Sequence, residues 1–183
     1  RRAFVPEPGW ALLSADYSQV ELRILAHLAE DSLLIDSFRK GEDIHSRTAA
    51  EVFGTLPGMV DREMRRRAKA VNFGIVYGQT AFGLAQGLGI PQKEAKRIID
   101  HYFERYSGVK RYMELQQILG RKEKEVRTYF GRRIPLRDID NPNAAVRSYS
   151  ERVAINAPIQ GTAADIIKKA MIAIAAWLEK EHM

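Results

Sequence analysis

The chain predicts an α+β fold that is mainly helical. Apolar residues recur at i, i+3, i+4 and i+7 in several segments, most clearly over residues 95–106, and this spacing is typical of the buried face of a helix. Strand-like patterns are confined to two short stretches, residues 10–15 and 126–136. With 183 residues, 45% of them hydrophobic, the chain can bury a core in one domain or in parts of two.

The charge of the chain favours a polyanionic partner. The net charge is +6 and the isoelectric point is near 9.6. Nucleic acid or a nucleotide is therefore the first candidate partner, ahead of an acidic membrane surface. Five basic residues fall within eight positions that contain one acid, Glu63; they are Arg62, Arg65, Arg66, Arg67 and Lys69.

The absence of cysteine excludes disulfides and thiolate metal sites, so any metal must be held by oxygen or imidazole ligands. No apolar run is long enough to span a bilayer, and the N-terminus lacks the pattern of a secretion signal. We therefore expect a soluble cytoplasmic protein with no membrane partner. Phosphate-binding loops of the Walker type, serine nucleophile elbows and zinc spacings are also absent from the sequence.

At the N-terminal end the pattern predicts a strand, an acid and a helix in that order. Residues 6–9, rich in Pro and Gly, predict a turn, and the apolar residues 10–15 predict a buried strand that ends near Asp16. From Ser18 onward the apolar spacing is helical, and Glu21 lies on that helix. Carboxylates at strand ends commonly hold divalent metal, although an exposed turn carboxylate is the alternative for Asp16.

A second helix is expected from Asp43, as its N-cap, through Phe53. His45 lies beside this cap. A lone histidine is more often a structural residue, and no ligand triad lies near it in the sequence, so metal binding by His45 is not expected. His45 could still donate a hydrogen bond to a phosphate.

The most informative segment spans residues 65–78, on a helix that is expected to begin near Asp61. Side chains four residues apart on it form a gently curving row, cationic at the N-terminal end and aromatic at the C-terminal end. Phosphates would meet the cations and a base or sugar the rings, so the row fits a nucleoside triphosphate. The alternative is a basic surface helix with core aromatics. The row consists of Arg65, Lys69, Phe73 and Tyr77.

Further along, a glycine-rich stretch over residues 83–91 is expected to separate this helix from a strongly amphipathic one. The mixed-sign run 121–125 is expected to be a solvated face, and residues 126–136 predict a small hairpin around Gly131. The predicted core face of the amphipathic helix contains Ala95, Ile98, Ile99, Tyr102, Phe103 and Tyr106.

The last third predicts two helical pieces that are broken at Pro158 and Gly161. Thr162 and Asp165 have the spacing of a capping box at the start of the second piece. Apolar residues then predict a buried face made of Ile166, Ile167, Ala170, Met171, Ile174 and Leu178.

A second polar row precedes that break, with Arg152, Asn156 and Gln160 at i, i+4 and i+8. Side chains of these types can reach acceptors in the minor groove of DNA, where sequence readout is largely degenerate. The alternative is a solvated helix face.

Taken together and in order, these segments resemble the family A DNA polymerases, the DNA polymerase I family. Residues 16–23 (DYSQVELR) resemble motif A, and residues 65–78 resemble motif B, which that family carries on the O helix of its fingers. The segments 43–45 (DIH), 130–133 (FGRR) and 152–165 also match in the family's order. The likeness covers nearly the whole chain.

The resemblance implies the fingers subdomain and an incomplete palm of a right-hand polymerase fold. Residues 1–30 would be a palm segment with motif A, 31–150 the fingers, and 151–183 helices returning to the palm. It further implies part of a DNA-templated DNA polymerase, which adds deoxynucleotides to a primer 3′ end by two-metal phosphoryl transfer in DNA replication or repair. Two Mg²⁺ ions are expected in the complete enzyme.

By position, the resemblance makes Asp16 a metal ligand and, with Lys69, a catalytic residue. The backbone carbonyl of Tyr17 would hold the nucleotide-side magnesium, and Glu21 would be the steric gate against a ribose 2′-OH. His45, Arg65 and Lys69 would contact the triphosphate.

The resemblance also assigns the aromatic end of the row and the second polar row. Phe73 would pack on the incoming sugar and base, and phenylalanine there is associated in this family with discrimination against dideoxynucleotides. Tyr77 would stack near the template base. The primer–template minor groove would be followed by Arg152, Asn156 and Gln160.

The chain departs from the family pattern: the thumb, the upstream palm and any exonuclease domain are not in this sequence, and two segments differ. The second metal carboxylate lies in motif C, a His-Asp-Glu strand downstream of the final helix, and the sequence stops at Met183 without it. Residues 124–125 are Lys-Glu where Gly-Tyr is more usual. We therefore expect a fragment that is inactive alone.

The expected partners are primer–template DNA, deoxynucleoside triphosphates and the remainder of the polymerase chain, in the bacterial cytoplasm or nucleoid. Two alternatives stay open. A non-catalytic nucleotide- or nucleic-acid-binding module would keep the basic row without needing Asp16 and Glu21. A single-subunit RNA polymerase relative is disfavoured by Glu21, since a 2′-OH gate would hinder ribonucleotides.

Overall fold

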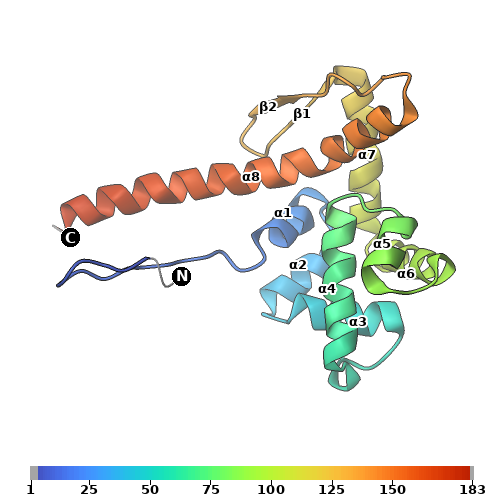
Figure 1. Cartoon of the computed structure of the whole chain (residues 1–183), viewed down its shortest axis with the longest axis horizontal. Coiled ribbons are helices and arrows are strands. Elements are labelled where there is room, and N and C mark those ends of the chain that lie inside the picture. Colours follow the sequence, from blue (N-terminus) through green and yellow to red (C-terminus); the bar gives the residue numbers. More distant parts are fainter. Residues whose placement is uncertain (1–3, 182–183) are drawn as a thin grey trace.

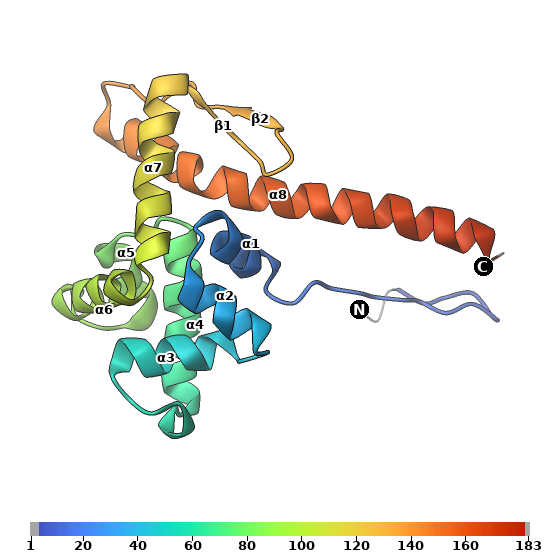
Figure 2. The same cartoon turned by 180° about the vertical axis from the view of Figure 1, so that it is seen from behind.

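The computed structural model describes residues 4–181 and consists of a helical body from which two segments project (Figure 1). Helices α1 to α7 and the first half of α8 form the body, and the far half of α8 and the N-terminal segment extend away from it, as the opposite view in Figure 2 also shows. One antiparallel pair of strands, with Val126 opposite Ile134, is the whole sheet of the described residues. The predicted mainly helical α+β class is confirmed.

The described part of the chain contains these elements in order: α1 (Val20–Leu28), α2 (Ser32–Arg39), α3 (Ile44–Phe53), a 3₁₀ turn (Pro57–Met59), α4 (Arg62–Val76), α5 (Ala81–Leu88), α6 (Gln92–Arg105), α7 (Ser107–Glu123), β1 (Glu125–Arg127), β2 (Arg133–Pro135) and α8 (Ala144–Lys180).

Side-chain caps set the starts of α3 and α4 at the predicted positions. Asp43 Oδ1 accepts from the amides of His45 and Ser46, at 3.0 and 2.9 Å, and Asp61 Oδ1 accepts from the Met64 amide at 2.7 Å. Such caps satisfy amides that have no partner within the helix. Both predicted helix starts are confirmed.

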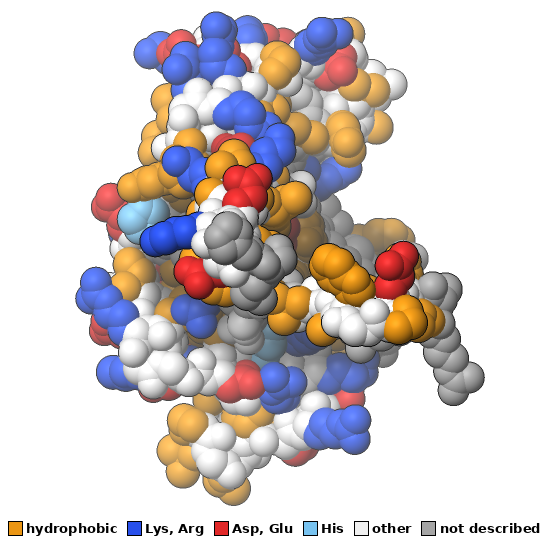
Figure 3. Space-filling model, turned by 90° about the vertical axis from the view of Figure 1, so that its left-hand side faces the viewer, with side chains coloured by type: hydrophobic (Ala, Val, Ile, Leu, Met, Phe, Trp, Pro, Cys, Tyr) orange, Lys and Arg blue, Asp and Glu red, His pale blue; other side chains and the backbone are white. Residues whose placement is uncertain are grey.

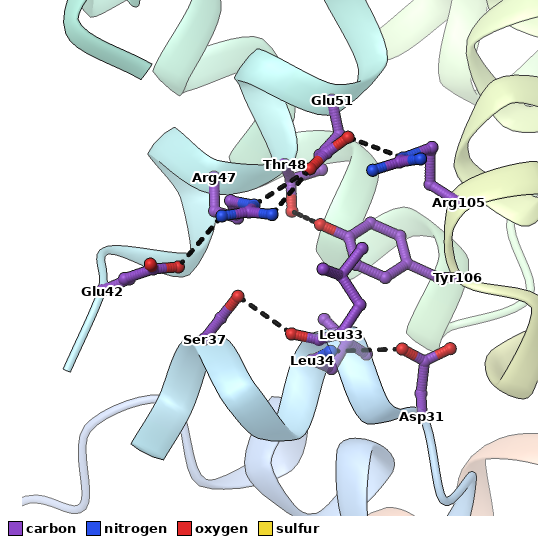
Figure 4. A network of polar contacts seen from close by, with 10 residues as sticks. All are labelled: Asp31, Leu33, Leu34, Ser37, Glu42, Arg47, Thr48, Glu51, Arg105 and Tyr106. Carbon is purple, nitrogen blue, oxygen red and sulfur yellow. Dashed lines mark hydrogen bonds and ion pairs between the residues drawn. The ribbon is translucent and has the colours of Figure 1, made fainter. Parts of the chain in front are cut away.

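The core lies between helices α1 to α7 and the first half of α8, and α6 contributes the face that its apolar spacing predicts. Tyr102 and Tyr106 are fully buried, whereas Ile99 and Phe103 are half-buried at its edge. At the same interface Glu51 of α3 pairs with Arg47 and with Arg105, which lies on α6 (Figure 4).

The glycine-rich stretch is a helix rather than a separator. Helix α5 begins after Thr80, whose hydroxyl accepts from the Gly83 amide, and it packs against α6 through Leu84 and Leu88. Burial of these leucines outweighs the weak helix propensity of two glycines, which is about 1 kcal/mol each.

The predicted hairpin is confirmed and encloses a second, smaller core of Val126, Leu136, Ile139 and Ala154. Its turn places Gly131 at φ +83°, a conformation that favours glycine. The residue before the hairpin, Lys124, also has a positive φ, of 56°, at the end of α7.

The predicted break at Pro158 and Gly161 is wrong, because α8 runs unbroken through both. Proline removes the amide that would bond the carbonyl four residues earlier, but here neighbouring structure supports the helix. Pro158 is buried, Tyr112 of α7 donates to the Ile155 carbonyl, and the Thr162 hydroxyl donates to the Pro158 carbonyl at 2.6 Å.

The predicted capping box of Thr162 and Asp165 is also wrong, since both residues lie inside α8 and bind the hairpin instead. Thr162 Oγ1 accepts from the Tyr129 amide at 2.9 Å, and Asp165 Oδ1 accepts from Arg132 Nε at 2.9 Å. Both side chains therefore make tertiary contacts, which a local sequence pattern cannot distinguish from a helix cap.

Two predictions of burial fail in the projecting segments. Residues 10–15 form no strand and are exposed, Leu13 to 90%, because no strand among residues 4–181 pairs with them. On the far half of α8, Ile167, Met171 and Ile174 are exposed as well. Figure 3 looks toward these ends and shows hydrophobic side chains on them. Within residues 4–181 no helix is both long and apolar enough to cross a membrane.

Candidate functional site

Helix α4 carries the predicted row along one accessible face. Arg65 and Lys69 are exposed, Phe73 is half-buried, and Tyr77 is 41% exposed just after the last helical turn. The rings of Phe73 and Tyr77 are nearly parallel, at 17°, with centroids 6.4 Å apart. Part of each ring at the aromatic end of the row is therefore accessible to a ligand and is not buried in the core.

At the cationic end, Arg65 is already engaged by Asp43. Its Nη2 and Nε atoms donate to Asp43 Oδ2 at 2.7 and 3.0 Å. Burial opposes ionisation of Asp43, but the hydrogen bonds from Arg65 and the Ser46 amide outweigh it, so the pKa of Asp43 lies below its usual value. Lys69 forms no ion pair with any residue among 4–181, so its ammonium group is free to meet an anion.

His45 reaches the same face from α3, which packs against α4. Its ring lies 5.9 Å from the Phe73 ring, and Asn72 Nδ2 lies 3.1 Å from its Nδ1. Burial lowers the pKa of His45; the Asp43 carboxylate opposes this, and the cations Arg65 and Lys69 reinforce it. A neutral imidazole beside two cations can donate one hydrogen bond to a phosphate without adding charge.

The aromatic end of the row opens into a cavity of about 500 Å³. Phe73, Tyr77, Gly78 and Thr80 line it, and Arg152 of α8 closes one side. Gly78 has φ +64°, and a Cβ atom there would lie 3.0 Å from Arg152 Cγ, so glycine permits this approach. The structure therefore joins the α4 row to the first residue of the second polar row.

Glu21 joins the site from α1. The Tyr77 hydroxyl donates to Glu21 Oε2 at 2.9 Å, a contact between residues that are 56 positions apart. Partial burial and this carboxylate both raise the pKa of Tyr77. The carboxylate is thereby fixed beside the aromatic end of the row, where a sugar would lie if the phosphates met Lys69.

Asp16 and Tyr17 lie apart from this cluster. Both are exposed in the extended segment before α1, where they line a separate cavity of about 380 Å³ with Ile167, Met171 and Ile174 of α8. Among the residues that the structure describes, no group of three His, Asp or Glu side chains could enclose a metal ion. The donors present, one carboxylate and one backbone carbonyl, are hard oxygens of the kind that Mg²⁺ prefers.

Along α8 the second polar row differs from residue to residue. Arg152 is half-buried, with its guanidinium carbon 5.7 Å from the centre of the Tyr149 ring, and Gln160 is exposed. Asn156 Oδ1 is buried and has no hydrogen-bond partner within residues 4–181. This acceptor is therefore shielded from solvent, and Gln160 is the most accessible member of the row.

Sequence reasoning missed one polar residue of this region, Asn72, which is fully buried between α3 and α4. A signal was present, since Asn72 stands four residues from Ala68 and Val76 and three from Ile75, all of which are buried. Helical spacing thus placed an amide in the core face of α4.

Comparison with known proteins identifies the family. The family model for DNA polymerase family A matches residues 1–183, and the chain belongs to this family. The chain is 53% identical over 183 residues to the DNA polymerase I of Pseudomonas aeruginosa and 52% identical over 184 residues to that of Geobacillus stearothermophilus. All of the chain is matched in both, but it spans only 20% and 21% of their lengths.

Among solved structures, the chain is similar to the POL domain of Pol1 from M. smegmatis, in complex with DNA primer-template and dNTP. The TM-score is 0.88 at 45% sequence identity, covering 92% of this chain and 30% of that one. The fold is accordingly that of part of a family A polymerase domain.

Proposed function

We propose that the chain is the nucleotide-binding part of a DNA-templated DNA polymerase, which extends a primer 3′ end in DNA replication or repair. The observation that carries this proposal is that Tyr77 and Arg152, from separate parts of the chain, line one cavity, while the Tyr77 hydroxyl binds Glu21 of α1. Family membership and the names of the relatives support it.

In this proposal the triphosphate lies along the cationic end of α4. Lys69 supplies an ammonium group that has no ion pair within residues 4–181, Arg65 supplies a guanidinium, and His45 supplies a neutral donor. Phe73 packs against the sugar and base, and Tyr77 stacks near the template base. Glu21, held by Tyr77, then crowds the 2′ position and favours deoxynucleotides.

Magnesium is the proposed cofactor, two ions in the complete enzyme, with Asp16 and the Tyr17 carbonyl as ligands from this chain. When bound, such ions would supply positive charge that offsets the negative charge on the phosphates. Asp16 and Lys69 are the proposed catalytic residues. Asp16 would provide a metal-binding carboxylate, and Lys69 would orient the phosphates.

Primer–template DNA is the second proposed partner, because the similar M. smegmatis domain was solved with primer-template and dNTP. The minor groove would lie along Arg152, Asn156 and Gln160. Residues 1–30 and 151–183 are the proposed palm segments and 31–150 the fingers, with the 150/151 boundary inside α8.

The remainder of the polymerase is the third proposed partner. The exposed apolar side chains of residues 10–15 and of α8 beyond Ile167 are the surfaces that it would cover. The isolated chain is then inactive, because a metal carboxylate and the surfaces that hold Asp16 in place come from elsewhere. A bacterial cytoplasmic or nucleoid location follows from the DNA substrate and the bacterial relatives.

A graft tests the proposal. The chain replaces the matching residues of G. stearothermophilus DNA polymerase I, and primer extension is measured with Mg²⁺ and dNTPs. The graft should extend the primer, Asp16→Ala should abolish extension, and Lys93→Ala, an exposed lysine on α6, should not change it. The isolated chain should give no product.

Two outcomes would support the alternatives. An Asp16→Ala graft with unchanged turnover would favour a non-catalytic binding module. Equal incorporation of ribo- and deoxynucleotides by the unsubstituted graft would remove Glu21 as a gate and favour the RNA polymerase alternative.

A further inference from the structure

A buried chain of hydrogen bonds links His45 to the core. Tyr106 Oη lies 3.4 Å from Thr48 Oγ1, a contact that is drawn as a dashed line in Figure 4. Thr48 Oγ1 donates to Asn72 Oδ1 at 3.1 Å. Asn72 Nδ2 in turn lies 3.1 Å from His45 Nδ1. Thr48 and Asn72 are fully buried and His45 is 3% exposed, so water does not substitute for these contacts.

The phenol of Tyr106 sets the direction of the chain. Burial raises the pKa of Tyr106 to about 12, so the phenol keeps its proton at neutral pH. Thr48 is its hydrogen-bond partner within residues 4–181. Tyr106 therefore donates, because a buried O–H without an acceptor costs more than an unused lone pair. The Thr48 hydroxyl in turn donates a hydrogen bond to Asn72 Oδ1.

This direction decides the tautomer of His45. With Oδ1 occupied by Thr48, Asn72 presents its N–H to His45, so Nδ1 must accept and the ring proton lies on Nε2. No residue within 4–181 accepts a hydrogen bond from Nε2, and this atom is not among the buried side-chain atoms that lack a partner. It therefore retains access to solvent or a ligand.

The charged groups around the ring favour the same neutral form. Arg65 and Lys69, both on α4, oppose protonation, and Asp43 at the start of α3 favours it. Burial tips the balance toward the neutral imidazole. The tautomer then matters, since only one ring nitrogen of a neutral histidine can donate.

We propose that Asn72 is a positioning residue that holds His45 as the Nε2–H tautomer, so that His45 donates to a triphosphate oxygen. This rests on the proposed nucleotide site. Asn72 does not touch the nucleotide itself. Thr48 and Tyr106 orient its amide from the core side.

The test uses the graft and separates KM from kcat. Asn72→Leu should raise the KM for dNTP about tenfold, because one hydrogen bond to a charged phosphate is lost. The same substitution should change kcat by less than about twofold. Inorganic tripolyphosphate should inhibit the Asn72→Leu graft more weakly, with an inhibition constant that rises by the same factor as the KM for dNTP. In a His45→Ala background, Asn72→Leu should have no further effect, because its action passes through that ring. Equal effects in both backgrounds would overturn the proposal.

A pH profile gives an independent readout. Asn72→Asp places an acceptor opposite Nδ1, so the neutral ring would hold its proton there and Nε2 would become an acceptor. The KM of this variant should rise with pH as His45 loses its charge, whereas the KM of the unsubstituted graft should show no such rise, because its neutral ring keeps the Nε2 proton. A flat profile for Asn72→Asp would contradict the proposal.

The Thr48 pair repeats the test without changing Asn72. Thr48→Val removes the hydroxyl that orients the amide and should raise KM, and Thr48→Ser should restore it. Thermal unfolding of each variant checks that it is folded. If the Asn72 variants do not fold, the Thr48 pair carries the test alone. Equal KM values for Thr48→Val and Thr48→Ser would then refute the proposal. A graft that is inactive before any substitution would instead refute the proposed function.

Discussion

Replacing Asp43 with asparagine should tighten triphosphate binding. Asp43 caps α3 through Oδ1 and binds Arg65 through Oδ2, so in this structure the carboxylate competes with a phosphate for the guanidinium. Asparagine caps helices about as well as aspartate, so Asp43→Asn removes the competitor and keeps the cap. The two side chains of the ion pair are 45% and 40% exposed, which limits its strength. Such pairs are worth about 0.5–1 kcal/mol, or about two- to fivefold in affinity.

The assay is the affinity of the graft for inorganic tripolyphosphate, measured by calorimetry at low and at moderate salt. Asp61→Asn is the matched control, since Asp61 caps α4 through Met64 and has no ion pair within the described residues. It should leave the affinity unchanged. If Asp43→Asn binds tripolyphosphate no more tightly than the unsubstituted graft while its fold is intact, Arg65 reaches phosphate without leaving Asp43 and the reasoning is refuted.

Three other predictions concern single contacts. Lys124→Gly should raise the free energy of unfolding by about 1 kcal/mol, because Lys124 has φ 56° at the end of α7, a conformation that favours glycine. The substitution also removes an exposed ion pair with Asp140, which contributes little stability. Thermal unfolding measures the net change. Tyr77→Phe removes the bond that holds Glu21, so discrimination against ribonucleotides should fall in primer extension; unchanged discrimination would show that Glu21 is held by other means. The pKa of Asp43 is depressed in the folded state, so its stabilisation is present above its unfolded pKa near 4 and is lost as pH falls through the folded value. Stability of the unsubstituted chain should therefore fall more than that of Asp43→Asn on acidification below about pH 5.

Features that depend on local chemistry were predictable from the sequence. The caps at Asp43 and Asp61 fall where side chains can reach the next free amides, and the α6 face follows from helical spacing alone. The four-residue row of α4 was equally predictable, since it needs only a continuous helix.

Features that depend on tertiary neighbours were not predictable. Pro158 does not break α8 because Tyr112 and the hairpin support that turn, and Thr162 and Asp165 bind the hairpin instead of capping a helix. The apolar residues 10–15 are exposed because a strand needs a pairing partner, which the described residues do not supply. The link between Tyr77 and Glu21 spans 56 positions, beyond any local pattern.

The equilibrium affinity of the graft for a dNTP with Mg²⁺, compared between Lys69→Ala and Lys93→Ala, tests most directly whether α4 is the nucleotide-docking helix. Loss of one charge-assisted phosphate contact, about 1.5–3 kcal/mol, predicts that Lys69→Ala weakens binding about 10- to 100-fold. Lys93→Ala should bind as the unsubstituted graft does. Equal affinities for the two variants would contradict the assignment of the α4 row to the triphosphate.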